Sequence, residues 1–401
     1  MQCIKCKGRG MCGKPCPILS KLKEFQPKIK TEFSGSSPPE IFVGRFNYPD
    51  VYTGILAPAE HGDTEQFSMP EIWHSKNFGI SEILAYRSSM IYSRFKSNIK
   101  SVKNPKRFLS VLQETAMTSK AIDMEFKLNK RPSLGFHLEQ KIPLIGNPAP
   151  LRFVRFQENV KIEKKIDYIV NDVDMKSLDA MYELYNARIS TSNIIKILSA
   201  GLLGIKKERK LVPTRWAITA TDSNLSDLML KEIRYFPLIS NFFLFNAEYL
   251  GNHYEIIFLP SIFSFEVLEA KVPGSVWNPS EELYFMCDYE SWYGRKNYAT
   301  NVTGGYYAVR LSVAEYLKKI KKQASVLVLR ECRPEYWAPC GVGILRECTR
   351  SAFQKQPEKF STLKEALQQA QKRMKLPIEE FIKRSILIKE FNQQKRLSNY
   401  F

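Results

Sequence analysis

The sequence predicts an α+β protein in which helices flank a mixed sheet. Two patterns predict this class: several segments have apolar residues at helical spacing, and β-branched and aromatic runs bounded by turn residues alternate with them. Of the 401 residues 44% are apolar and 25% are charged, an ordinary composition for a folded globular protein. We expect one main body over residues 41–391, with a subdivision near residues 150–210.

The first sixteen residues contain two closely spaced pairs of cysteines. The expected ligands of a metal ion are Cys3, Cys6, Cys12 and Cys16. Two short loops that each supply two thiolates suit a tetrahedral Zn²⁺ site, although an iron–sulfur cluster also takes four cysteines and two disulfides are the metal-free alternative. We therefore expect a zinc element over residues 1–18. A Lys- and Ser-rich linker is expected over residues 19–40, which contain SGSSPPE.

Four segments in the first half of the chain have helical periodicity. They are GISEILAYRSSMIYSRF, PKRFLSVLQETAM, KSLDAMYELYNARI and SNIIKILSAGLLG. Pro105 suits the first turn of the second helix, and Gly201 and Gly204 suit the end of the fourth. The next segment, RWAITAT, is rich in β-formers and predicts a strand, followed by a helix over NLSDLMLKEI with Asp222 or Ser223 as its cap.

The C-terminal half begins with a predicted hairpin. FFLFNAEYL and YEIIFLP flank Gly251-Asn252, and IFSFEVLEA predicts a third antiparallel strand. The helix YYAVRLSVAEYLKKIKKQ then runs into SVLVL, whose continuous apolar character predicts a strand covered on both faces. The other four cysteines, Cys287, Cys332, Cys340 and Cys348, are expected to be buried structural thiols.

Two helices are predicted near the C-terminus. Thr362 and Glu365 have the spacing of a capping box that opens TLKEALQQAQKRM. Pro377 begins a second helix, IEEFIKRSILIKEF. The apolar side chains of this helix that can pack on the body are Ile378, Phe381, Ile382 and Phe391.

The charge is unevenly distributed. The net charge is +19, and residues 1–30 (eight basic, one acidic) and 351–401 (eleven basic, five acidic) together carry +13 of it. Basic ends on a nearly balanced body indicate a polyanionic partner, most simply nucleic acid, and a lysine-rich thermophilic surface is the alternative. Because no apolar run is long enough to span a bilayer or to form a signal peptide, we expect a cytoplasmic protein without a membrane partner.

Three clusters join arginine to tryptophan or tyrosine. They are VPTRW, DYESWYGRK and RECRPEYW. Such pairs clamp phosphates and stack bases, and the expected nucleic-acid-binding residues are Arg215, Trp216, Arg295, Lys296, Arg310, Arg330, Arg333 and Trp337. Asp288, Glu290 and Glu331 are candidate acid–base groups. The alternative is that these Arg–Glu pairs only lock strand ends together.

Four long motifs carry a family likeness: VGRFNYPDVYTG, KLVPTRWAIT, GGYYAVRLSVAEYL and VLVLRECRPEYWAPCGVG. They resemble the archaeal Nre family of DNA repair proteins, in particular its NreA type, and the resemblance covers nearly the whole chain. It implies a role in the archaeal DNA damage response and a metal-ligand role for the four N-terminal cysteines. It gives no secure catalytic residue, so whether the protein is an enzyme stays open.

The resemblance also implies that residues 392–401 are a tail that binds the sliding clamp PCNA. Gln394, Leu397, Tyr400 and Phe401 take the consensus positions of a PCNA-interacting (PIP) motif. One turn of helix would place the leucine and the two rings on one side as an apolar plug. We expect a DNA-binding repair factor recruited by the clamp. The alternatives are a DNA-processing enzyme, either a glycosylase or a nuclease, and a nucleotide-binding enzyme.

Overall fold

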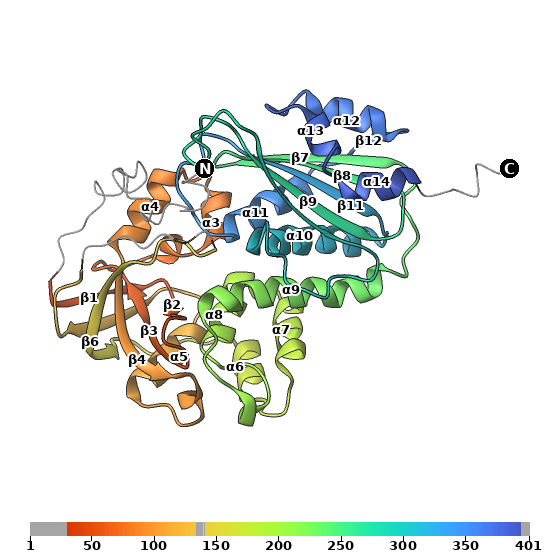
Figure 1. Ribbon diagram of the computed structural model, residues 1–401. Helices are drawn as coiled ribbons and strands as arrows, with labels where there is room; N and C mark the ends of the chain where they lie inside the picture. The colour runs from red at the N-terminus through yellow and green to blue at the C-terminus, as the bar shows by residue number, and fades with distance from the viewer. Residues whose placement is uncertain (1–29, 134–138, 140, 394–401) are drawn as a thin grey trace. The chain divides into compact units, whose positions relative to one another are not determined.

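The computed structural model describes residues 30–133, 139 and 141–393, and these form two compact units. Of the described residues, the N-terminal unit comprises 30–225 and 338–344, and the C-terminal unit comprises 226–337 and 345–393. Each unit contains a six-stranded mixed sheet with helices packed on it, which confirms the mixed α+β class (Figure 1). In the described ranges no helix is both long and apolar enough to cross a membrane.

The sheet of the N-terminal unit has the strand order β1-β5-β6-β4-β3-β2. Its strands are β1 (Glu32–Ser37), β2 (Glu40–Val43), β3 (Asp50–Ala57), β4 (Ile91–Asn98), β5 (Ile122–Leu128) and β6 (Asn147–Phe156). All neighbouring strands are antiparallel except β4 and β6, which are parallel. Side chains of β5 alternate between buried and half-buried, as expected for a strand with one face on the core.

Helices of the N-terminal unit follow most of the predicted segments. They are α3 (Pro70–Ser75), α4 (Ile80–Ser89), α5 (Arg107–Met117), α6 (Lys164–Asn171), α7 (Ser177–Asn186) and α8 (Thr191–Ser199), with short 3₁₀ turns η2 (Glu65–Phe67), η3 (Ile99–Lys103) and η4 (Lys206–Glu208). The Ser190 side chain accepts a hydrogen bond from the Asn193 N–H and caps α8. α5 packs against β2, β3 and β6, and α8 packs against α5 and β2, so the two helices cover one face of the sheet.

Two expectations for the N-terminal unit are corrected by its sheet. The predicted helix GISEILAYRSSMIYSRF ends at Ser89, and the residues from Ile91 onward form β4 because they pair with β3, a partner about forty residues earlier in the chain. The predicted linker contains β1, which pairs with β5. Ser37 Oγ donates to the Leu56 carbonyl at 2.9 Å, so this Ser-rich stretch is tied into the sheet.

The predicted strand RWAITAT is also wrong, because it lies within the helix α9 (Thr214–Ile233). Ala217, Thr221 and Leu225 are fully buried and recur every four residues, which is the period of a helix face. The β-branched residues of a seven-residue window concealed this longer period. The boundary between the two units falls inside α9, between Leu225 and Ser226, C-terminal to the region where the sequence predicts a subdivision.

The sheet of the C-terminal unit has the strand order β10-β9-β11-β8-β7-β12. Its strands are β7 (Phe242–Tyr249), β8 (Asn252–Leu259), β9 (Ser264–Lys271), β10 (Tyr284–Glu290), β11 (Ser325–Cys332) and β12 (Glu358–Phe360). The β7–β8 hairpin is as predicted, and Leu250 and Gly251 both have positive φ in its two-residue turn. A Cβ on Gly251 would lie 2.5 Å from the Tyr336 backbone nitrogen, so the turn requires glycine there.

The third strand of the expected meander has different neighbours. β9 is not next to β8, because β11 lies between them, parallel to β9 and antiparallel to β8. β9 is antiparallel only to β10. A strand that returns after a long helical connection and inserts between two earlier strands leaves no local mark in the sequence.

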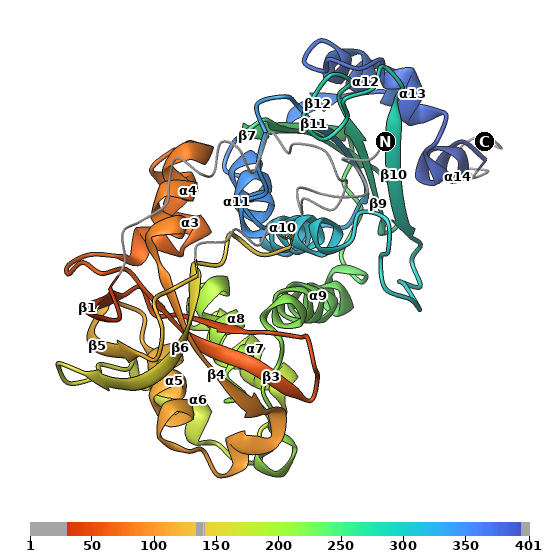
Figure 2. The same ribbon diagram turned by 60° about the vertical axis from the view of Figure 1, so that its left-hand side comes forward.

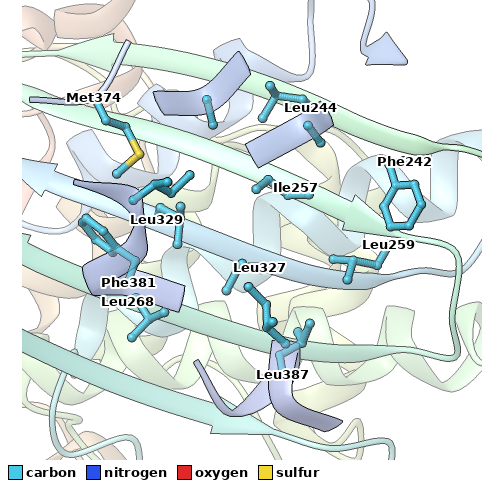
Figure 3. Close-up of a cluster of buried hydrophobic side chains, with 14 of the residues drawn as sticks. Phe242, Leu244, Ile257, Leu259, Leu268, Leu327, Leu329, Met374, Phe381 and Leu387 are labelled. Atoms are coloured by element: carbon cyan, nitrogen blue, oxygen red, sulfur yellow. The ribbon is translucent and has the colours of Figure 1, made fainter. Parts of the chain in front are cut away.

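Helices cover both faces of this sheet, as the apolar SVLVL run predicts (Figure 2). The helices are α10 (Gly304–Ile320), α11 (Gly343–Ala352), α12 (Leu363–Gln371), α13 (Ile378–Ile382) and α14 (Ile386–Gln393). On one face Phe245 packs edge-on against Tyr316 of α10, with ring centroids 5.0 Å apart. On the other face Leu327 and Ile257 pack against Phe381 and Leu387 (Figure 3).

The C-terminal helices match the prediction except for one break. The capping box of Thr362 and Glu365 is formed, because each side chain bonds to the other residue's backbone N–H. The expected continuous helix after Pro377 is divided at Ser385, whose Oγ accepts from the Ile388 N–H at 3.0 Å and donates to Glu266. The four apolar side chains predicted to pack on the body do so: Ile378, Phe381, Ile382 and Phe391.

Candidate nucleic-acid interface

A cavity of about 310 Å³ opens beside β2 in the N-terminal unit. It is lined by Phe42, Val43, Gly44, Arg45, Phe46, Tyr52, Tyr92, Arg94, Glu139, Ile145, Gly146, Pro148, Pro213 and Arg215. The lining thus combines three arginines with four aromatic rings. We call it the arginine–aromatic cavity.

The register of the sheet brings the wall of this cavity together from four strands. Phe42 of β2 lies opposite Gly54 of β3, which lies opposite Arg94 of β4. A Cβ on Gly54 would lie 2.2 Å from the Ser93 carbonyl oxygen, so the close approach of β3 and β4 requires glycine there. Tyr92 lies two residues before Arg94 on β4 and is paired with Pro148 of β6. Tyr92 and Pro148 therefore lie on the same face of the sheet as Arg94.

The start of α9 supplies the remaining arginine. The Val43 N–H donates to Thr214 Oγ1 at 2.9 Å, which fixes the first turn of α9 beside β2. Arg215 follows directly and forms an ion pair with Glu139. Arg45 donates to the same Glu139 oxygen at 3.2 Å. One carboxylate therefore holds two arginines at the cavity.

The lining carries a formal charge of +2, since it has three arginines and one carboxylate. Arg94 makes no ion pair within the described ranges; its guanidinium lies 4.4 Å from the Tyr52 ring centroid, and its buried Nε has no hydrogen-bond acceptor there. A buried donor without an acceptor costs about 1–3 kcal/mol, so an anionic ligand at this position would relieve that cost.

Exposed aromatic rings lie beside the cavity. Phe46 is 64% exposed and lies 4.9 Å from the Arg45 guanidinium. Trp216 and Tyr48 are about half exposed, with ring centroids 5.4 Å apart. Exposed rings next to arginines are the means by which proteins stack unpaired bases. Of the predicted nucleic-acid-binding residues, Arg215 and Trp216 are the two that the structure places here.

Two further predicted arginines lie together in the C-terminal unit with two of the predicted carboxylates. Arg310 is buried and bonds Glu290 at 3.0 and 3.2 Å, and it also bonds Asp227 at 2.7 Å. Arg295 donates to Asp288 at 3.1 Å. Burial raises the pKa of Glu290, although the charge of Arg310 opposes that rise.

Asp288 has a second function in the fold. Its Oδ2 accepts the backbone N–H groups of Asn301 and Val302, at 3.1 and 2.7 Å, so it holds the segment that leads into α10. Both Asp288 and Glu290 are almost fully buried, at 4% and 2% exposure. Their contacts are those of groups that organise the fold.

Glu331 and Arg333 lie on the opposite face of the same sheet. The Glu331 carboxylate is fully buried and accepts from Arg333 and from the backbone N–H groups of Lys375 and Leu376. Arg330, its neighbour in sequence, points to the other face, where it pairs with Glu269 and lies near Gly305 of α10. The third sequence cluster is therefore divided between two faces.

The last two predicted binding residues of this unit are Lys296, which is exposed, and Trp337, which is half-buried.

Two family models match this chain: Archaeal Nre, N-terminal, over residues 11–278, and Archaeal Nre, C-terminal, over residues 290–400. The chain belongs to the archaeal Nre family. The first match ends at residue 278 and the second begins at residue 290, so most of β10 falls between them. The seam therefore lies inside the sheet of the C-terminal unit and not at the boundary of the compact units of this Nre chain. No solved structure matches it.

Three relatives cover most of this Nre chain. It is 35% identical to DNA repair protein NreB of Archaeoglobus fulgidus, over 98% of both chains. It is 38% identical to DNA repair protein NreA of the same organism, over 93% of this chain and 94% of the relative. It is 34% identical to DNA repair protein NreA of Haloferax volcanii, over 84% and 83% of the two chains.

Some predicted site residues lie outside the described residues. They are Cys3, Cys6, Cys12, Cys16, Gln394, Leu397, Tyr400 and Phe401. Within the described ranges no group of three or more His, Cys, Asp or Glu residues could hold a metal ion. Of the other cysteines, Cys332, Cys340 and Cys348 are buried as expected, and Cys287 is half-buried.

Sequence reasoning missed most of the arginine–aromatic cavity of this Nre chain. Phe42, Tyr52, Tyr92 and Arg94 come from three strands and were not singled out as site residues. The signal that could have found them is the alternation in IYSRFK, which puts Tyr92, Arg94 and Lys96 on one face. The helical spacing of the residues before Met90 masks this alternation.

Proposed function

We propose that this Nre chain is a DNA-binding protein of DNA repair, and that the arginine–aromatic cavity is where it contacts DNA. The observation that carries the proposal is Arg94, a guanidinium with no carboxylate partner within the described ranges, set among aromatic rings. Lone guanidinium groups and exposed rings are complementary to phosphates and bases. The names of three relatives, each a DNA repair protein, support the same process.

The DNA-binding proposal is tested by fluorescence anisotropy with labelled single-stranded and duplex oligonucleotides at several salt concentrations. We expect binding that weakens with salt, with a slope of log K against log salt of about −0.9 for each phosphate contacted on duplex DNA. Absence of binding at low salt to both kinds of DNA would reject the proposal.

We also propose that the PCNA sliding clamp recruits this chain through its terminal peptide. Gln394, Leu397, Tyr400 and Phe401 have the PIP spacing, and Lys395 and Arg396 suit an acidic rim. Three buried apolar side chains contribute about 1.5–3 kcal/mol each before ordering costs. Titration of PCNA with the full chain, a chain lacking residues 393–401 and a Tyr400→Ala/Phe401→Ala variant tests this, and equal affinity of all three would exclude it.

Zn²⁺ is the metal we propose for the N-terminal cysteines. The two cysteine pairs have the spacing of a tetrahedral thiolate site. Elemental analysis of the purified chain should give about one zinc per chain, lost when Cys3 and Cys6 are changed to serine. A metal content that the double substitution leaves unchanged, or iron in place of zinc, would contradict this assignment.

A further inference from the structure

The arginine–aromatic cavity has the size of a small-ligand site. Its volume of about 310 Å³ lies at the lower end of the roughly 300–1,000 Å³ typical of ligand pockets. A base pair stacked inside a duplex cannot enter a cavity of this kind, because its neighbours above and below hold it in place. A single base that has left the stack can enter.

The walls favour a flat, partly apolar group. Phe42 and Tyr92 pack edge to face with ring centroids 5.4 Å apart, and Ile145 and Pro148 complete an apolar side. Burial raises the pKa of Tyr92, so its hydroxyl stays protonated and neutral. A phosphate ion alone does not match these walls, because it would leave the aromatic rings without a contact.

The arginines favour an anion attached to that group. Arg94 has no carboxylate partner in the described part of the chain, and the lining as a whole carries a formal +2. An uncharged apolar ligand would leave this charge uncompensated in a partly enclosed site. The combination that satisfies both the rings and the charge is a base with its own phosphate.

The rim extends the same chemistry to the neighbouring nucleotides. Phe46, Tyr48 and Trp216 are all at least 44% exposed, and the Lys96 ammonium lies 5.5 Å from the Tyr52 ring centroid. Exposed rings at the mouth can stack the bases on either side of one that has entered. A rim of this type would not be needed for a free mononucleotide.

We propose that the cavity receives one nucleotide extruded from a DNA strand, with Arg94 on its phosphate and the Phe42, Tyr52 and Tyr92 rings around its base. This inference rests on the proposed DNA-binding function and names the ligand of the same site. Extrusion costs a few kcal/mol in a paired duplex and least at a mismatch. The protein therefore prefers DNA in which one base is already unpaired.

Two measurements on the full chain test the inference. Isothermal titration with dAMP, deoxyadenosine and inorganic phosphate should give the tightest binding for dAMP, because only dAMP supplies both base and phosphate. Anisotropy should give tighter binding to a duplex with one central mismatch than to the matched duplex.

Two variants test the residues named in the inference, Arg94→Gln and Tyr52→Leu. Each should reduce the mismatch preference by about tenfold, which is the effect of losing one stacking or phosphate contact.

Arg107→Gln is the matched control. Arg107 also stacks on an aromatic ring, Phe153, at 4.8 Å in the same unit, but it does not line the cavity. It should keep both dAMP binding and the mismatch preference. Circular dichroism and unfolding curves confirm that each variant folds.

The outcomes separate the two proposals. Binding of duplex DNA with no mismatch preference and no dAMP binding would overturn the extruded-nucleotide inference and leave the DNA-binding proposal intact. Equal affinity for dAMP and inorganic phosphate would also overturn it, because the rings would then contribute nothing. No binding of any DNA would remove both.

Discussion

Arg94 of the N-terminal unit and Arg310 of the C-terminal unit both lie over tyrosine rings, at 4.4 Å from Tyr52 and 5.4 Å from Tyr307. Their charge partners differ. Arg310 is held by the carboxylates of Glu290 and Asp227, whereas Arg94 makes no ion pair within the described ranges. An arginine beside an aromatic ring is therefore not enough to indicate a binding site. The carboxylate that does or does not accompany it decides whether its charge is available to a ligand.

The same contrast extends to the other predicted binding residues. Arg295, Arg330 and Arg333 of the C-terminal unit each pair with a carboxylate of their own sheet. A paired, buried arginine presents little net charge to DNA, because the carboxylate beside it cancels its charge. The electrostatics of the C-terminal unit thus favour stability, and those of the cavity in the N-terminal unit favour a ligand.

The substitution Arg310→Met should have the largest effect, a loss of free energy of unfolding. Removing one partner of a buried ion pair typically costs about 3–5 kcal/mol, because Glu290 is left charged and buried. Burial raises the pKa of Glu290, so the folded state binds this proton more tightly than the unfolded state does. The stability that the bound proton contributes is present at low pH and is lost as the pH rises through the raised pKa. Urea unfolding should therefore show a smaller deficit at pH 5 than at pH 7.

The control for this prediction replaces both partners. Arg310→Met/Glu290→Met should recover most of the lost stability, since the buried carboxylate is removed together with its cation and Asp227, the other carboxylate that Arg310 bonds, is 52% exposed and stays hydrated. An Arg310→Met chain that unfolds at the same urea concentration as the parent would break the comparison between the two units.

Glu331→Gln has the next largest expected effect. Its carboxylate accepts four hydrogen bonds, two from Arg333 and one each from the Lys375 and Leu376 N–H groups, and such charged bonds contribute about 1.5–3 kcal/mol each. We expect unfolding at clearly lower urea, while Glu335→Gln, at an exposed ion pair with Lys375, changes stability by about 0.5 kcal/mol or less. Loss of a DNA-processing activity with unchanged stability would instead assign Glu331 to catalysis.

Arg94→Gln should leave folding nearly unchanged and alter the salt dependence of DNA binding. Because Arg94 has no carboxylate partner among the described residues, its loss strands no buried charge there, and we expect a stability change of about 1 kcal/mol or less. The slope of log K against log salt should fall in magnitude by about 0.9, the contribution of one phosphate contact. An unaltered slope, measured beside Arg107→Gln, would show that Arg94 does not contact phosphate.

The smallest expected effect is the slow chemical labelling of the buried cysteines in the folded chain. Burial raises the pKa of Cys332 to about 11 and those of Cys340 and Cys348 to about 12. Because the thiolate is the reactive form, these thiols should react very slowly at pH 8 in the folded chain and rapidly in urea. Cys340 belongs to the N-terminal unit and the other two to the C-terminal unit, so mass spectrometry of labelled peptides checks that both cores are closed. Fast labelling of Cys340 alone would mean that the units differ in packing as well as in charge.

The sequence by itself determined the features that depend on near neighbours. Apolar spacing predicted α5, α7, α8 and α10, the Thr362–Glu365 pair predicted the start of α12, and the continuous apolar run predicted that β11 is covered on both faces. These are set by side chains within a few residues of one another, because caps and helix faces repeat over one or two turns.

The tertiary structure decided the pairing partners. It placed β11 between β8 and β9, turned Ile91–Asn98 into a strand against β3, and assembled the cavity from β2, β3, β4, β6 and the start of α9. It also gave Arg310 its carboxylates and placed Arg94 over the Tyr52 ring without an ion pair in the part of the chain that the structure describes. Strand pairing and ion pairing join residues tens of positions apart, and local periodicity carries no information about which distant residue will be the partner.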